Sequence, residues 1–116
     1  QDYRWVAPGE SVQWRAFRRL VGLLRHRGND LLVIVGPINR HMMTESAATA
    51  YAALEQTCRD WLKTEGIPAV CPPLLPSEQY CDASHPSGEG YRWEAEQLLA
   101  DPIFSGWLGR PSRSRQ

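Results

Sequence analysis

An aspartate and a histidine stand three residues apart in the segment CDASHPSGEGY, residues 81 to 91. A histidine that acts as a general base needs a hydrogen-bond acceptor on its second ring nitrogen, because the acceptor fixes the tautomer and stabilises the imidazolium that forms. Asp82 can offer that acceptor to His85 within a tight turn. The alternative is that Asp82 and Ser84 cap the following helix and His85 is a surface residue, since short motifs often arise by chance.

Two short apolar segments would position this turn and a second polar loop. Residues 31 to 35 (LLVIV) and about 67 to 71 (IPAVC) are predicted to form adjacent or near-adjacent parallel strands. Reactive groups in open parallel sheets lie in loops beyond the carboxyl ends of the strands. Asn39 follows the first segment, whereas Asp82 and His85 follow the second. Asn39 is therefore a candidate substrate-binding residue, although an asparagine in this context more often forms a turn.

Three helices are predicted around these strands. The first begins after a Ser11 cap, ends at Gly28 and carries apolar residues at helical spacing: Trp14, Phe17, Leu20, Val21 and Leu24. The second begins after a Thr44 cap, the third begins near Gly88, and a last short turn covers residues 102 to 108.

This alternation of helices and strands predicts an α/β fold with a three-layer, flavodoxin-like parallel sheet, of which the chain supplies about two strands and three helices. Two strands alone leave sheet edges and faces uncovered, so we expect incomplete burial of the sheet. Residues 1 to 109 are accordingly predicted to be the C-terminal half of a larger α/β domain, and residues 110 to 116 a disordered basic tail.

Charge and hydropathy argue against several function classes. Thirteen basic and thirteen acidic residues give no net charge, and hence no general attraction to nucleic acids or anionic membranes. The five arginines in residues 14 to 27 (WRAFRRLVGLLRHR) are interpreted as the solvated face of an amphipathic helix, and no nucleic-acid partner is expected. No window approaches the ~20 apolar residues of a membrane helix, so no membrane segment is expected in this chain.

Three cysteines, Cys58, Cys71 and Cys81, show no C-x-x-C spacing. Their spacing to His85 is unlike that of zinc sites, so we expect no metal and no cofactor. Cys71 and Cys81 are expected to lie near one another, and Cys58 is expected to be a buried free thiol. The redox compartment stays open.

The order of these motifs resembles the SGNH, or GDSL-type, hydrolase superfamily. In that family a terminal D-x-x-H-P block followed by G-Y precedes the last helix, and DASHPSGEGY is similar to it. VIVGPIN resembles the penultimate strand, and IPAVCPPLLPSEQY resembles the last strand and its approach to the active site. The G-P-I-N turn is closest to the branch of the teichoic-acid D-alanylation protein and the alginate O-acetyltransferases. The resemblance covers most of residues 12 to 100.

The resemblance implies a general base at His85 and an orienting carboxylate at Asp82. The family's serine nucleophile belongs to an early G-D-S motif that this chain lacks, and the blocks that supply the oxyanion hole are also missing. We therefore expect part of a serine esterase or O-acyltransferase that acts on an acyl ester or acylated carbohydrate. The missing N-terminal half of the domain, or a partner chain, would supply the serine, and this chain alone should be inactive on esters.

The resemblance slightly favours an extracytoplasmic location. The alternative class is a non-catalytic α/β module for interaction or carbohydrate binding, in which Asp82 serves only as a cap.

Overall fold

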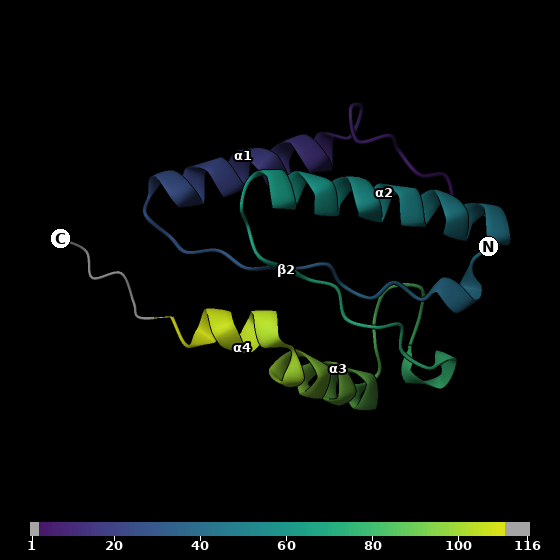
Figure 1. The fold of residues 1–116 in the computed structure, drawn as a ribbon. Coiled ribbons are helices and arrows are strands. Elements are labelled where there is room, and N and C mark those ends of the chain that lie inside the picture. The colour runs from purple at the N-terminus through teal and green to yellow at the C-terminus, as the bar shows by residue number, and fades with distance from the viewer. Residues whose placement is uncertain (1–2, 111–116) are drawn as a thin grey trace. The chain divides into compact units, whose positions relative to one another are not determined.

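The computed structural model describes residues 3 to 110, which divide into two compact units. Unit 1 comprises the described residues of Gln1–Leu31 and Arg40–Ile67, and unit 2 those of Leu32–Asn39 and Pro68–Gln116. The element order along the chain is α1, β1, η1, α2, β2, η2, α3 and α4 (Figure 1). The predicted tail at 110 to 116 lies outside the described residues except for Arg110.

Unit 1 is built from α1 (Val12–His26), the short 3₁₀ helix η1 (Arg40–Met42) and α2 (Glu45–Thr64). Ser11 caps α1 by accepting a hydrogen bond from the Trp14 amide, and Thr44 caps α2 in the same way. Each helix is followed by a glycine with a positive φ, which a residue without a Cβ adopts at little cost. Both predicted helices are therefore confirmed.

Aromatic side chains join α1 to α2, and Figure 1 shows the two helices side by side. Trp14 lies with its ring centroid 5.2 Å from that of Trp61, and Phe17 lies 6.0 Å from Trp61, both in edge-on contacts. Val21 and Leu62 are buried. Trp14 and Phe17 of the predicted apolar stripe thus contact α2, as expected for an amphipathic helix, whereas Leu20 of the same predicted stripe is 50% exposed.

Unit 2 contains the sheet. Strands β1 (Val33–Ile34) and β2 (Ala69–Val70) are parallel, with Val33 opposite Ala69 and Ile34 opposite Val70. The predicted parallel pairing is confirmed, but each strand has two residues where the sequence predicted five. Pro68 precedes β2 and Pro72 follows it closely, and a proline cannot donate to a sheet ladder, so regular pairing along β2 stops early.

The remaining elements of unit 2 are η2 (Ser77–Gln79), α3 (Gly88–Ala100) and α4 (Pro102–Leu108). The segment predicted as a short turn is a helix, because the Asp101 side chain accepts from the amides of Ile103 and Phe104 and Pro102 starts the first turn. The described chain therefore has four α-helices and a small parallel sheet, which confirms the mixed α/β class.

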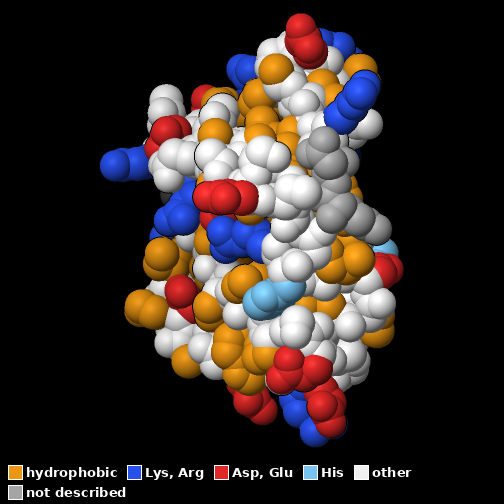
Figure 2. Space-filling view, turned by 90° about the vertical axis from the view of Figure 1, so that its right-hand side faces the viewer, with side chains coloured by type: hydrophobic (Ala, Val, Ile, Leu, Met, Phe, Trp, Pro, Cys, Tyr) orange, Lys and Arg blue, Asp and Glu red, His pale blue; other side chains and the backbone are white. Residues whose placement is uncertain are grey.

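Apolar side chains remain exposed in unit 2, as expected from so few elements. Ile34 in β1 is 41% exposed, and further large apolar residues are exposed on α3 and α4: Tyr91, Leu99, Ile103 and Leu108. Hydrophobic side chains also reach the surface on the face drawn in Figure 2. Within residues 3 to 110 we find no helix that combines the length and the hydropathy needed to cross a bilayer.

Candidate functional site

The candidate site is a closed loop that follows β2 and precedes α3. An antiparallel bridge joins Tyr80 to Pro86, and the Cys81 amide donates to the His85 carbonyl oxygen at 2.8 Å. Below the bridge, the Ser87 amide donates to the Gln79 carbonyl oxygen at 2.7 Å. These bonds leave residues 82 to 85 as the tip of the loop, held by the backbone on both sides.

Asp82 organises the tip of this loop. Its Oδ1 accepts hydrogen bonds from the backbone amides of Ser84 and His85, each at 2.8 Å. Such a side-chain turn is a common use of aspartate, because its short side chain reaches amides two and three residues ahead. The side chain does not cap α3, since Ser87 holds that position and accepts from the Gly90 amide. The helix-cap alternative for Asp82 and Ser84 is therefore wrong.

The predicted pair of Asp82 and His85 is present. His85 Nδ1 lies 2.8 Å from Asp82 Oδ2 and 2.9 Å from Oδ1. An ionised carboxylate can only accept, so Nδ1 carries the hydrogen in this contact. In the neutral imidazole, Nε2 is then the nitrogen with a free lone pair. This is the tautomer that a general base requires.

Ser84 cannot act as the missing nucleophile in this arrangement. Its Oγ lies 3.3 Å from His85 Nδ1, the nitrogen that already donates to Asp82. A serine that gives its proton to the base must contact the other nitrogen, Nε2. The Ser84 hydroxyl instead adds a weak contact of 3.5 Å to Asp82 Oδ1.

Both side chains of the pair are largely exposed, at 67% for His85 and 56% for Asp82. Even so, the pKa of Asp82 is lowered to about 2. The main cause is the hydrogen bond from the Ser84 amide, followed by the bonds from the His85 side chain and the His85 amide. Donors to the charged form favour it, so Asp82 stays ionised through the whole physiological pH range.

Asn39 lies against the same loop. Its backbone amide donates to the Ala83 carbonyl oxygen at 2.9 Å, and its side-chain Nδ2 donates to the Asp82 carbonyl oxygen at 3.2 Å. Asn39 is only 5% exposed, and its buried Oδ1 has no hydrogen-bond partner among residues 3 to 110. The structure thus brings Asn39 to Asp82, where it holds the loop. A contact between Asn39 and a substrate stays a prediction.

Gly90 has a role in the site that sequence reasoning did not separate from that of Gly88. A Cβ on Gly90 would fall against the Gln79 carbonyl oxygen and lie 3.0 Å from Pro86 Cβ, whereas one on Gly88 would meet nothing within 4 Å. The close approach lets the first turn of α3 pack directly on the base of the loop. No sequence signal distinguished the two glycines, because both stand in the same helix start.

The cysteines form no disulfide with one another in residues 3 to 110. Cys58 was predicted to be buried, but it is half-buried. Burial, and secondarily the charge of Glu55, raises the pKa of its thiol. Cys81 lies in the loop with its Sγ 3.8 Å from the Pro86 carbonyl oxygen. The described residues contain no group of three or more His, Cys, Asp or Glu residues arranged to hold a metal ion.

Comparisons with known proteins do not identify the chain further: no family model, no curated protein and no solved structure matches it. The geometry defines a mixed α/β protein with a small parallel sheet and an ordered aspartate and histidine pair in the loop after β2. Membership of the SGNH superfamily stays a prediction that rests on the motif order and on this pair.

Asp82 should titrate well below an ordinary aspartate. Its pKa in the folded chain is lowered from 3.8 to about 2, so its contribution to loop stability is fully present above pH 3.8 and is lost as the pH falls to about 2. The Asp82 carboxyl ¹³C chemical shift, followed by NMR during an acid titration, measures the pKa of Asp82. His85→Ala should raise the Asp82 pKa only part of the way, because the Ser84 amide remains. A midpoint near 3.8 in the unmodified chain would contradict the hydrogen bonds described for Asp82.

Proposed function

We propose that this chain carries the base half of the catalytic triad of an SGNH-type serine esterase or O-acyltransferase. The observation that carries the proposal is the contact of 2.8 Å between His85 Nδ1 and Asp82 Oδ2 in a loop that follows a parallel strand. Asp82 is ionised and fixes the tautomer, which leaves Nε2 as the base. The motif order of DASHPSGEGY supports the same assignment.

In the proposed reaction, a serine outside these 116 residues attacks the carbonyl carbon of an ester. His85 Nε2 takes the serine proton, and Asp82 stabilises the imidazolium that results. The imidazolium then returns the proton to the leaving alcohol, which leaves an acyl-enzyme. Water or a sugar hydroxyl then attacks the acyl carbon while His85 Nε2 takes its proton. His85 returns that proton to the serine oxygen as the serine–acyl bond breaks, and the choice of acceptor decides between hydrolysis and transfer. The substrate is an acyl ester or an acylated carbohydrate.

The exposure of the pair and of Ile34 supports the placement of this chain as the C-terminal half of a three-layer, flavodoxin-like domain. An exposed catalytic base would be unusual in a complete site, because active sites exclude water around the reacting groups. The missing half of the domain or a partner chain would cover the pair, add strands to the sheet, and provide the serine and the oxyanion hole. The proposed location is extracytoplasmic, because the resemblance to the SGNH superfamily favours it.

A serine-directed fluorophosphonate tests the proposal in the full-length protein. We expect covalent labelling of a serine that lies outside residues 1 to 116, strong reduction of labelling in His85→Ala, and unchanged labelling in Ser84→Ala. The chain of 116 residues alone should stay unlabelled. A full-length protein with no reactive serine would contradict the proposal.

The second candidate is a non-catalytic module for protein interaction or carbohydrate binding. The 67% exposure of His85 in the chain as it stands is the observation behind this candidate, because an imidazole that no other group encloses can contact a partner directly. Binding of an acylated oligosaccharide by full-length protein that shows no labelling and no turnover would select this candidate.

A further inference from the structure

A second feature of the chain lies in unit 1, where a hollow of about 400 Å³ opens between α1 and the C-terminal part of α2. Four arginines of α1 line it: Arg15, Arg18, Arg19 and Arg25. Trp61 of α2 and Glu65, which caps the C-terminus of α2, also line it. A hollow of this volume falls within the range of small-ligand sites.

Most of the positive charge in this hollow is not neutralised. Arg25 forms an ion pair with Glu65 at 3.0 Å. Arg15, Arg18 and Arg19 form no ion pair with any acidic residue in the part of the chain that the structure describes. The backbone positions of these three arginines lie within about 6 Å along the helix axis. Like charges on neighbouring positions of a helix repel one another, and an anion bound among them would relieve that repulsion.

One of these arginines is held in place by an aromatic ring. The Arg18 guanidinium carbon lies 5.6 Å from the centroid of the Trp61 ring. Trp61 is itself fixed by edge-on contacts with Trp14 and Phe17. A cation–π contact does not use the N–H donors of the guanidinium, so Arg18 can still donate to an oxyanion.

Gly22 supplies an independent observation. It lines the hollow in the middle of α1, where glycine favours the helix less than alanine does. Neither backbone geometry nor packing requires it, since its φ is not positive and a Cβ there would meet nothing within 4 Å. At 3.6 residues per turn, Gly22 lies in the middle of the arc that carries the four arginines. Its missing side chain keeps the space between the guanidinium groups open.

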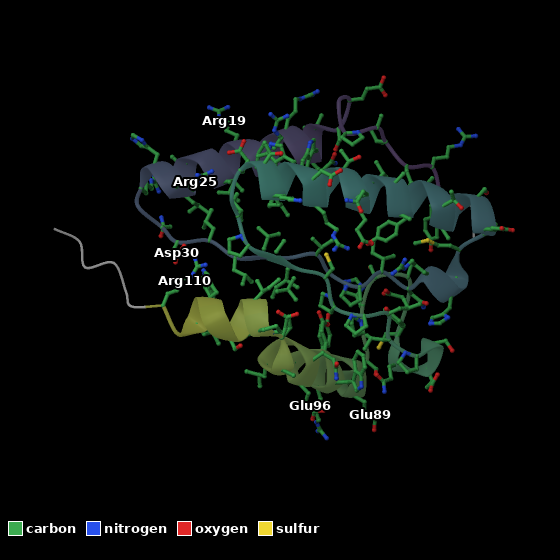
Figure 3. All side chains as sticks on the ribbon, in the orientation of Figure 1. Arg19, Arg25, Asp30, Glu89, Glu96 and Arg110 are labelled. Atoms are coloured by element: carbon green, nitrogen blue, oxygen red, sulfur yellow. The ribbon has the colours of Figure 1, made fainter. Side chains whose placement is uncertain are left out.

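We propose that this hollow binds a phosphate group, either of a small phosphorylated molecule or of a phospholipid headgroup. A carboxylate has two oxygens and suits one bidentate arginine, whereas a phosphate monoester or diphosphate has enough anionic oxygens for Arg15, Arg18 and Arg19 together. Arg19 and Arg25 are labelled on α1 in Figure 3. The arginines of this segment are exposed, as expected for a solvated helical face, and the proposal adds a binding role to that face. It is independent of the proposed esterase function.

Titration of the full 116-residue chain with sodium pyrophosphate, followed by isothermal calorimetry against sodium chloride of equal ionic strength, tests the site. The double variant Arg18→Gln with Arg19→Gln should bind about tenfold more weakly or worse, since charge-assisted bonds are lost. A matched control, Arg4→Gln with Arg92→Gln, removes the same charge from exposed residues outside the hollow and should bind normally. Equal weakening of both double variants, or no binding by the unmodified chain, would overturn the proposal.

Gly22→Gln separates loss of binding from loss of folding. Glutamine favours the helix more than glycine does, so the midpoint of thermal unfolding should rise while pyrophosphate affinity falls. Unchanged affinity in this variant would contradict the site.

Vesicles of phosphatidylcholine with phosphatidic acid distinguish the two sources of the phosphate. Binding that Arg18→Gln with Arg19→Gln abolishes would assign a headgroup, and pyrophosphate binding without vesicle binding would assign a small molecule. A single-stranded oligonucleotide that binds tightly while pyrophosphate does not would overturn the proposal in favour of nucleic acid.

Discussion

Replacement of His85 by alanine is expected to lower ester turnover by the full-length protein about 10²- to 10⁴-fold, the usual contribution of a general base. The fold should survive, because the His85 side chain is largely exposed and the loop is closed by backbone bonds at Cys81 and Ser87. Steady-state kinetics on a chromogenic acyl ester, together with circular dichroism of the same samples, measure both effects.

Two further substitutions in the same loop separate the roles of its residues. Asp82→Asn should retain some activity, because the imidazole remains but the amide can donate to Nδ1 and so favours the wrong tautomer. The Ser84→Ala variant should turn over esters at nearly the rate of the unmodified enzyme, since the Ser84 hydroxyl contacts only His85 Nδ1 and Asp82 Oδ1. Normal hydrolysis and transfer rates in His85→Ala would show that the catalytic assignment is wrong.

Substitution of Gly90 by alanine is expected to destabilise unit 2 by roughly 1 to 3 kcal/mol, the usual cost of overpacking a close contact. The new Cβ would press on the Gln79 carbonyl oxygen, which accepts the hydrogen bond from the Ser87 amide at the base of the loop. The shift should also loosen the contact between His85 and Asp82. Urea denaturation measures the free energy of unfolding. The Asp82 carboxyl ¹³C chemical shift shows whether the contact between Asp82 and His85 is kept.

Gly88→Ala is the matched control for this experiment. Both glycines lie in the first turn of α3, but a Cβ at position 88 would meet nothing within 4 Å. Alanine there should be neutral or stabilising by up to about 1 kcal/mol, through its higher helix propensity. If the two variants unfold at the same urea concentration, the close packing described for Gly90 is not important for stability.

The sequence was sufficient to predict those parts of the structure that depend on contacts between neighbours along the chain. Ser11 and Thr44 cap their helices because each accepts from an amide three residues ahead. The pair of Asp82 and His85 was predictable for the same reason, since three residues in a turn bring carboxylate and imidazole within reach. The parallel pairing of β1 and β2 is not a local contact, and it was predicted from the general rule that apolar segments joined by a helix form parallel strands.

The tertiary structure decided what depends on residues far apart. Asn39 donates to the Asp82 carbonyl oxygen across 43 positions, so no local pattern could show that it holds the loop. The open space at Gly22 becomes visible only when α2 brings Trp61 alongside the arginines of α1. Gly90 differs from Gly88 only because Gln79 folds back against it. Local hydrogen bonds and apolar periodicity are encoded in short segments, whereas burial and close approach exist only after distant segments meet.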